Sequence, residues 1–327
     1  PHANGGECSH NCVQSTSCLS SVVTMSKSDQ NDLPVVRAKL HAPRIPSDLV
    51  CRDRLRELPA RNPGRPFTLV SAPAGYGKST LVAHWLTTDN LPGTWFSLEK
   101  SDNDVRQFLT YLIAAVRKLS RKACETTLSL LRAPELPRLA SLREQLSNDL
   151  DAIRKPFLLV LDDFHRIDRT EVHEIINHLL DLPPRPLHLV IVTRHDPPVE
   201  LTKLRADGRM VDVRERDLRF TEEETRAVLQ QLAGIEIADE LLAHIHSELE
   251  GWIVGLRLVC LALQNRDDPE SFLRGLSGGT STTQDYLARE VLSQHPDTFR
   301  HDLLSSAILD RFCAPLCAAV CGLDGGR

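Results

Sequence analysis

The segment FTLVSAPAGYGKSTL, which starts at Phe67, constrains the fold more than any other part of the chain. FTLVSA is apolar and β-prone, PAGYGK cannot continue a strand, and STLVAHWL is helical in composition. This strand–turn–helix unit matches a phosphate-binding loop, except that Ala72 stands where the usual pattern has its first glycine. The predicted nucleotide-binding loop consists of Ala72, Pro73, Ala74, Gly75, Tyr76, Gly77, Lys78, Ser79 and Thr80.

The residue types in this loop indicate how it would bind ATP or ADP with Mg²⁺. Gly75 and Gly77 allow backbone N–H groups to converge on the phosphates, and the following helix directs its positive end at them. Lys78 can reach the β- and γ-phosphates, and the Ser79 hydroxyl can ligate Mg²⁺. Gly-Lys-Ser also occurs in ordinary turns, but its place between a strand and a helix favours the nucleotide site.

A second candidate site lies in the run FLLVLDDFHRI, where an apolar strand leads into Asp162 and Asp163. Parallel α/β sheets bind ligands at the carboxyl ends of their strands. Asp162 would hold Mg²⁺, and Asp163, free of the metal, could orient or deprotonate the attacking water. Two adjacent acids can also form a simple turn, but the preceding phosphate loop favours the catalytic interpretation.

A third strand, LHLVIVT, ends immediately before Arg194. A guanidinium matches phosphate geometry and stays charged, so an arginine at this strand tip could sense the γ-phosphate. The alternative is a surface salt bridge. Because the other two motifs precede it, we favour the sensor, and the predicted catalytic residues are Asp163, Lys78 and Arg194.

The remaining pattern predicts an α/β fold followed by helices. Apolar runs at 94–98, 157–161, 187–193 and 210–213 alternate with helical stretches, as in a doubly wound parallel sheet covered on both faces. After these runs, TEEETRAVLQQL predicts a helix with Thr221 as N-cap and Glu224 in capping-box spacing. Further helices are expected at 240–249, 252–264, 284–293 and 298–306, with a loop at 277–283.

Composition excludes several classes of function. The 327 residues include 39 Lys and Arg against 44 Asp and Glu, and the net charge of −5 provides no basic field for nucleic acid or anionic lipid. The apolar stretches are too short for a bilayer, and no signal-peptide pattern is present. The nine cysteines, an odd number scattered along a large chain, are expected to be reduced thiols. These features predict a cytoplasmic protein with no membrane partner.

Taken in order, six sequence runs resemble one family. KLHAPRIPSDLVCRDRLREL, VSAPAGYGKSTL, LVLDDFHRI, VIVTRHDPP, LRFTEEE and EGWIVGLRL are together similar to the ATPase module of MalT-like, LuxR-type transcriptional activators. These activators belong to the signal transduction ATPases with numerous domains (STAND). The resemblance covers residues 36–322, and the ordered series of motifs is more specific than the phosphate loop alone.

The resemblance implies a regulatory switch. Family members hold ADP as a closed monomer, exchange it for ATP when an inducer binds, and then self-associate, with slow hydrolysis as the reset. They continue into an inducer sensor and a helix-turn-helix, and neither pattern occurs before Arg327. A small-molecule inducer and DNA would therefore act only through segments outside this sequence, and the chain looks like a fragment.

The resemblance also implies site residues and domain boundaries. Val50 and Arg52 would lie against adenine, although Cys51 stands where many relatives have glycine. Gly251-Trp252 and Gly255-Leu256 resemble the helical-domain motif that closes over the nucleotide, although Trp252 could equally be a core residue. We expect four parts, comprising a disordered segment at 1–35, a P-loop ATPase domain at 36–216, a helical subdomain at 217–278, and the start of a winged-helix domain at 279–327.

Two other functions are compatible with the same residues. The chain could be a constitutive P-loop ATPase that performs mechanical work, which steady turnover without an inducer would indicate. It could also be a degenerate, truncated fragment that only sequesters nucleotide or a partner, which poorly cooperative unfolding would indicate.

Overall fold

A computed structural model describes most of the chain. The described residues are 35–56, 58, 64–88, 92–263, 269–274, 297–309 and 313–322. The predicted disordered segment at 1–35, apart from its last residue, lies outside these ranges, as do the predicted helix at 284–293 and the predicted loop at 277–283.

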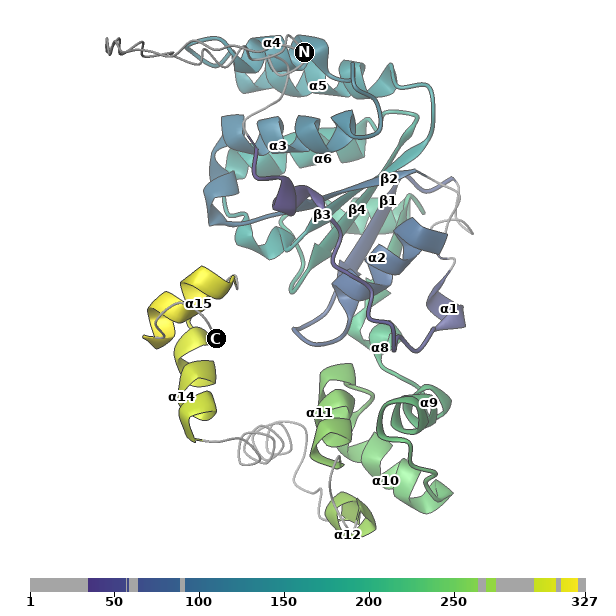
Figure 1. The fold of residues 1–327 in the computed structure, drawn as a ribbon. Helices are drawn as coiled ribbons and strands as arrows, with labels where there is room; N and C mark the ends of the chain where they lie inside the picture. Colours follow the sequence, from purple (N-terminus) through teal and green to yellow (C-terminus); the bar gives the residue numbers. More distant parts are fainter. Residues whose placement is uncertain are drawn as a thin grey trace, which may run out of the picture. The chain divides into compact units, whose positions relative to one another are not determined.

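A five-stranded parallel sheet forms the centre of the fold, in the strand order β2-β3-β4-β1-β5 (Figure 1). Each strand begins and ends within two residues of a predicted apolar run, because short apolar runs between turn signals encode buried parallel strands. This architecture confirms the predicted α/β P-loop fold. The strands are β1 (Phe67–Ser71), β2 (Gly93–Ser97), β3 (Phe157–Asp162), β4 (Leu187–Thr193) and β5 (Met210–Arg214).

Helices cover both faces of the sheet, as Figure 1 shows for α2 (Lys78–Thr88) on one side and α3 (Val105–Arg117) on the other. The alternation of side chains along β2 explains this arrangement. Trp95 is buried in the cluster that includes the α2 side chains, whereas the neighbouring Phe96 ring stacks on Tyr111 of α3 at a centroid distance of 5.4 Å. Neighbouring strand residues point to opposite faces, so both faces of the sheet are buried.

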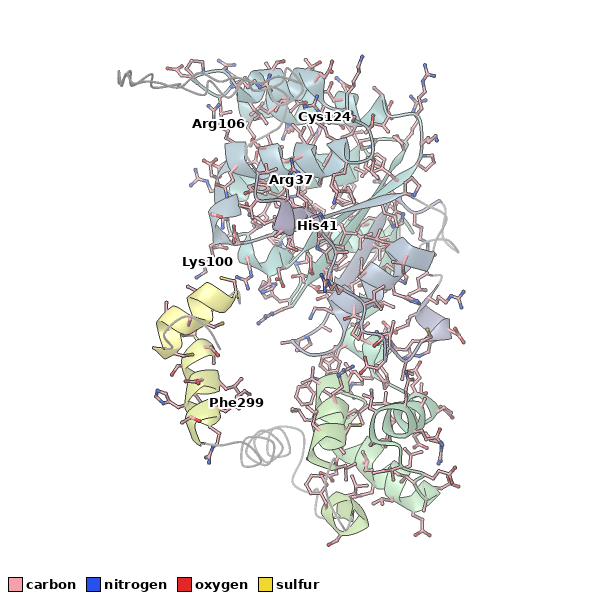
Figure 2. The ribbon with its side chains drawn as sticks, viewed as in Figure 1. Arg37, His41, Lys100, Arg106, Cys124 and Phe299 are labelled. Carbon is pink, nitrogen blue, oxygen red and sulfur yellow. The ribbon has the colours of Figure 1, made fainter. Side chains whose placement is uncertain are left out.

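Two helices between β2 and β3 were missed by the sequence analysis. They are α4 (Glu125–Leu131) and α5 (Leu139–Asp151), which contact each other and pack on α3 and on α6 (Thr170–Asp181). The Arg106 side chain, labelled in Figure 2, donates to the backbone carbonyls of Leu131, Ala133 and Pro134, where α4 ends. This tertiary contact satisfies carbonyls that a short helix leaves unpaired, and no local sequence signal encodes it.

The segment before the phosphate loop is anchored at the β2 edge of the sheet by a buried lysine. Lys39, in η2 (Arg37–Leu40), is 1% exposed, and its ammonium lies 2.6 Å from the Asp102 carboxylate and 2.9 Å from Glu99. The same ammonium lies 4.2 Å from the ring centroid of Tyr111. A buried charge is stable only when it is paired in this way, so these contacts place residues 37–40 against the edge strand.

A second hydrophobic core begins at Phe220 and involves none of the strands. It contains apolar side chains of α9 (Glu222–Ala233), α10 (Asp239–Leu249), α11 (Ile253–Leu263) and α12 (Pro269–Arg274). The predicted capping box is present, since the Thr221 hydroxyl accepts from the Glu224 N–H and the Glu224 carboxylate accepts from the Thr221 N–H. The predicted domain boundaries stay predictions, although the two separate cores are compatible with the one near residue 216.

Shorter elements complete the described chain. They are α1 (Asp53–Arg56), η3 (Lys100–Asn103), η4 (Phe164–Arg166), α7 (Leu201–Ala206), α8 (Glu215–Leu218), α14 (Asp297–Ser306) and α15 (Ala314–Cys321). Within the described ranges, none of the helices has the length and apolar character needed to cross a membrane.

A partly buried histidine on β4 makes the stability of the sheet sensitive to acid. His188 Nε2 lies 2.8 Å from the Thr68 hydroxyl, and burial lowers the pKa of His188 to about 4. The unfolded chain therefore binds more protons than the folded chain between about pH 6.5 and pH 4, and stability falls as the pH falls through this window. When the pH falls from about 7 to about 5, we expect the unfolding free energy of the wild type to decrease by about 2 kcal/mol more than that of His188→Gln.

Urea denaturation at the two pH values measures this difference. His301→Gln, at an exposed position on α14, is the matched control and should follow the wild type. Equal acid sensitivity of His188→Gln and the wild type would contradict the assignment.

Candidate nucleotide site

The loop between β1 and α2 has the backbone shape needed to surround phosphates. Gly75 and Gly77 adopt φ angles of +84° and +72°, in the left-handed region that side chains disfavour. Helix α2 begins at Lys78, so its unpaired N–H groups and positive dipole end face the loop. Consecutive N–H groups with this arrangement form an anion-binding concavity.

The Lys78 ammonium lies within this loop. It donates to the Pro73 carbonyl at 2.7 Å, which holds the side chain across the loop opening. Burial lowers the pKa of Lys78, and the nearby charge of Arg194 lowers it further. A partly desolvated ammonium with a neighbouring cation would be stabilised by an anion, as expected for a phosphate-binding lysine.

Asp162 and Ser79 meet where β3 ends beside the start of α2. The Ser79 hydroxyl donates to Asp162 Oδ1 at 3.0 Å, and Asp162 is 7% exposed. Burial raises the pKa of Asp162 to about 6, and the adjacent Asp163 contributes to the increase. A hydroxyl and a buried carboxylate with a raised pKa fit Mg²⁺, because a divalent cation would offset the cost of the buried negative charge.

Asp163 has a different environment from its neighbour. Its backbone is left-handed (φ 57°), its side chain is 41% exposed, and its carboxylate lies 3.9 Å from His165 Nδ1 and 3.8 Å from Arg166 Nε. The sequence analysis did not identify His165, whose buried Nδ1 makes no hydrogen bond within the described structure. The signal was available, since His165 follows the acid pair by two positions in the same turn.

Arg194 follows β4 directly and is exposed. Together with Ala72 and Pro73 of the phosphate loop it lines an open hollow of about 690 Å³. Its charge influences the pKa of both Lys78 and His165, so the guanidinium lies close to the two motifs with which it was grouped. The structure therefore brings together all three residues of the predicted catalytic set.

A cavity of about 390 Å³ adjoins the phosphate loop on the side of the helical core. Val50 and Arg52, the residues expected beside adenine, both line it. Its other walls are mostly apolar, as suits a planar base. Most of these residues carry no signal in the sequence, because α9 and α11 reach the loop only through tertiary packing. The cavity is lined by Pro46, Asp48, Leu49, Val50, Arg52, Gly75, Gly77, Thr80, Phe220, Val228, Leu232, Ile253, Val254 and Arg257.

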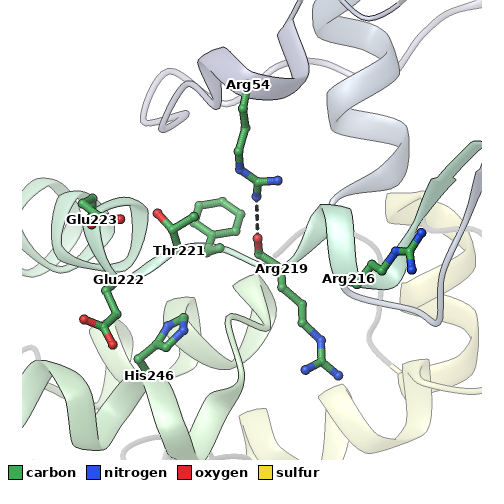
Figure 3. A pocket seen from close by; sticks show the side chains of 8 residues that line it. Arg54, Arg216, Arg219, Thr221, Glu222, Glu223 and His246 are labelled. Carbon is green, nitrogen blue, oxygen red and sulfur yellow. Dashed lines mark hydrogen bonds between the residues drawn. The ribbon is translucent and has the colours of Figure 1, made fainter.

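Arg52 also joins the two cores. It is 8% exposed, donates to the Leu218 carbonyl at 2.8 Å, and lies 4.9 Å from the ring centroid of Phe220. Burial lowers the pKa of Arg52 to about 10. Arg54 reinforces this connection by donating to the Arg219 carbonyl at 2.5 Å, the dashed line in Figure 3. The segment before the loop is thus tied to the chain that leads into α9.

Trp252 contacts the phosphate loop directly. Its indole N–H donates to the Ala74 carbonyl at 3.3 Å, and the Val254 N–H donates to the Gly75 carbonyl at 3.4 Å. A Cβ atom at Gly75 would lie 2.5 Å from Trp252 Nε1. The motif EGWIVGLRL therefore lies at the loop, as the resemblance implied, and Trp252 is more than a core residue.

Comparisons with known families match two parts of the chain. Residues 48–192 match the AAA ATPase domain, and residues 288–327 match the MalT winged helix domain. The first match contains the phosphate loop, the two acids and all of β4 except Thr193. Together, the two matches support an ATPase regulatory module that contains a nucleotide-binding ATPase domain.

Several solved structures are similar to this chain. A STAND protein with a tetratricopeptide repeat sensor from Pyrococcus horikoshii is 15% identical, with a TM-score of 0.53 over 89% of this chain and 41% of that protein. A Walker-type ATPase of Pyrococcus abyssi is 14% identical, with a TM-score of 0.45 over 86% of this chain and 91% of that one. The chain thus spans less than half of the STAND protein's length, and this likeness shows the fold alone.

The contact between Gly75 and Trp252 predicts a difference between two glycine substitutions. Gly75→Ala would add both φ strain and a clash with the indole, whereas Gly208→Ala, also at positive φ (+64°), has nothing within 4 Å. We expect Gly208→Ala to cost about 1 kcal/mol and leave nucleotide binding unchanged. Gly75→Ala should cost more and weaken ADP binding at least about tenfold, because the loop and the indole must both shift.

Denaturation and calorimetric ADP titration of the two variants measure these effects. Equal behaviour of Gly75→Ala and Gly208→Ala in both assays would contradict the described contact.

Proposed function

We propose that this chain is the ATP/ADP-binding switch module of a MalT/LuxR-type transcriptional regulator, in which slow hydrolysis of ATP resets an ATP-driven self-association. The observation that carries the proposal is the contact of Trp252 and the start of α11 with the phosphate loop, beside a cavity shared by the loop and the helical core. A nucleotide in this site would touch both cores at once. Its exchange would therefore be coupled to their relative arrangement.

The residues around the loop support specific roles in nucleotide binding. The loop N–H groups and Lys78 would bind the phosphates, Thr80 lines the base cavity, and Val50 and Arg52 would border the base. Ser79 and Asp162 would hold Mg²⁺, which supplies charge neutralisation at the phosphate oxygens.

Hydrolysis would depend on Asp163 and Arg194. Asp163 is exposed enough to accept a proton from water, and it follows the buried Asp162, which accepts a hydrogen bond from the Ser79 hydroxyl. Arg194 would stabilise negative charge on the γ-phosphate, because a guanidinium stays ionised beside another cation.

The net charge and the winged-helix segment support a regulatory role. A net charge of −5 disfavours direct binding of DNA by this chain, so the winged-helix segment would act as an interdomain switch element. An inducer and DNA would bind through other parts of the protein, and the ATP form would self-associate in the cytoplasm.

The first test identifies the nucleotide that the protein holds. Residues 25–327 are purified, bound nucleotide is released by denaturation and identified, and ADP and ATP·Mg²⁺ are titrated by calorimetry. Co-purified ADP with slow exchange would support the switch. Lys78→Ala should lower affinity for both nucleotides by at least about tenfold, since it removes a charged phosphate contact, and unchanged affinity would overturn the proposal.

Asp163→Asn separates hydrolysis from binding. Loss of the group that accepts the proton of water should lower the rate of ATP hydrolysis by about 10²- to 10⁴-fold, while ATP affinity changes little. Asp181→Asn, which breaks an exposed ion pair with Lys203, is the matched control and should keep the wild-type rate. A single-turnover assay measures the rates, and undiminished hydrolysis by Asp163→Asn would remove this residue from the mechanism.

The alternative of a constitutive ATPase makes a different prediction. Turnover of about 1 s⁻¹ or more in the wild type without an inducer would favour a working enzyme over a switch. Empty protein that binds neither nucleotide would favour the degenerate fragment.

A further inference from the structure

The turn that carries Arg194 is held on both sides of this residue. On one side, the Thr193 carbonyl accepts from the Ala72 N–H at 3.3 Å, which ties the end of β4 to the start of the phosphate loop. The Thr193 hydroxyl then donates to the His195 carbonyl at 2.8 Å, across Arg194 itself. On the other side, the turn is held by the side chain of Asp196.

Asp196 belongs to a network of four charged side chains, which also includes Arg205 of α7 and Asp212 and Arg214 of β5. Arg214, the last residue of β5, contacts both oxygens of Asp196, the longer contact being 3.2 Å, and its Nε donates to Asp212 at 2.5 Å. Arg205 of α7 donates to Asp212 at 2.8 Å and lies 3.6 Å from Asp196. A two-contact arginine–carboxylate pair fixes orientation as well as distance, so this network fixes the turn after β4 relative to β5.

The network also determines what Arg194 does not contact. Asp196 is the nearest carboxylate along the chain, two positions from Arg194, and would be an obvious ion-pair partner for it. Hydrogen bonds from Arg214 lower the pKa of Asp196, so the carboxylate is ionised and already paired. Among the described residues, Arg194 has no ion-pair partner. Its positive charge lowers the pKa of Lys78 in the phosphate loop.

We propose that Arg214, acting through Asp196, is a positioning residue that keeps Arg194 directed at the γ-phosphate and thereby determines how strongly the site distinguishes ATP from ADP. This inference rests on the proposed nucleotide-binding function and on the sensor role of Arg194. Arg214 itself touches no nucleotide in this scheme. Its effect should therefore appear only with the ligand that has a γ-phosphate, and only when Arg194 is present.

The test compares affinities for ADP and for a β,γ-imido analogue of ATP, both with Mg²⁺, in calorimetric titrations of the whole chain. Arg214→Gln should lower affinity for the ATP analogue by about three- to tenfold and leave ADP affinity unchanged. Arg214→Lys should be intermediate, because a lysine keeps the charge and loses the two-contact geometry. Arg185→Gln, which breaks the exposed pair with Asp151 near the amino ends of β3 and β4, is the matched control and should leave both affinities unchanged.

A double-mutant cycle tests whether Arg214 acts through Arg194. Arg194→Ala should reduce the preference for the ATP analogue by at least as much as Arg214→Gln, and the double variant should lose little more than Arg194→Ala alone. Fully additive losses, or equal losses of ADP and analogue affinity in Arg214→Gln, would overturn the inference and indicate a purely structural role. If Arg214→Gln does not fold, Asp196→Asn at its half-exposed position replaces it in the same cycle.

The wild type separates this inference from the proposed function. A wild type that binds neither nucleotide would overturn both. A wild type that binds both nucleotides, with an unchanged preference in Arg194→Ala or Arg214→Gln, would overturn only the positioning role.

Discussion

The contact between Ser79 and the buried Asp162 is the constraint on which the rest of this site depends. It joins residues 83 positions apart, and it requires β1 and β3 to end at the same edge of the sheet. Parallel pairing through β4 provides that alignment, with Ser71 level with Thr193 and Leu161 level with Ile191. Because the Asp162 carboxylate is buried, its negative charge is unfavourable without a cation, and a bound metal ion would stabilise it. The strand order thus places the phosphate loop, the acids Asp162 and Asp163, and Arg194 close together.

Contacts between the two cores connect the phosphate loop to the helical core. Arg52 lies between the phosphate loop, the Leu218 carbonyl and the Phe220 ring, and Trp252 binds the outer carbonyl of the loop. Each side chain donates to a defined backbone carbonyl, Arg52 from a buried position and Trp252 from a partly buried one, which makes the contacts specific in geometry. A nucleotide that moved the loop would therefore move α11, and a displaced α11 would alter the loop.

Some charged side chains around the site form ion pairs, and others do not. Arg214 and Asp196 satisfy each other, and Lys39 is fully paired at the opposite edge of the sheet, whereas Arg194 is exposed without an ion-pair partner in the described chain. Paired charges maintain the positions of loops, and an unpaired cation beside the phosphate loop can interact with a ligand. This division explains how arginines of one chain can differ in what their charges contact, which composition alone does not reveal.

The sequence by itself determined the strands, the phosphate loop, the acid pair and the capping box at Thr221, because each is encoded by neighbouring residues through periodicity, glycine conformation or capping chemistry. It indicated Val50, Arg52 and Trp252 only through resemblance to a family. Only the tertiary structure showed α4 and α5, the cavity walls from α9 and α11, His165 beside Asp163, and the pairing of Arg214 with Asp196. These features join segments far apart in sequence or depend on side-chain direction, and a local pattern carries no information on which distant residue will be the partner.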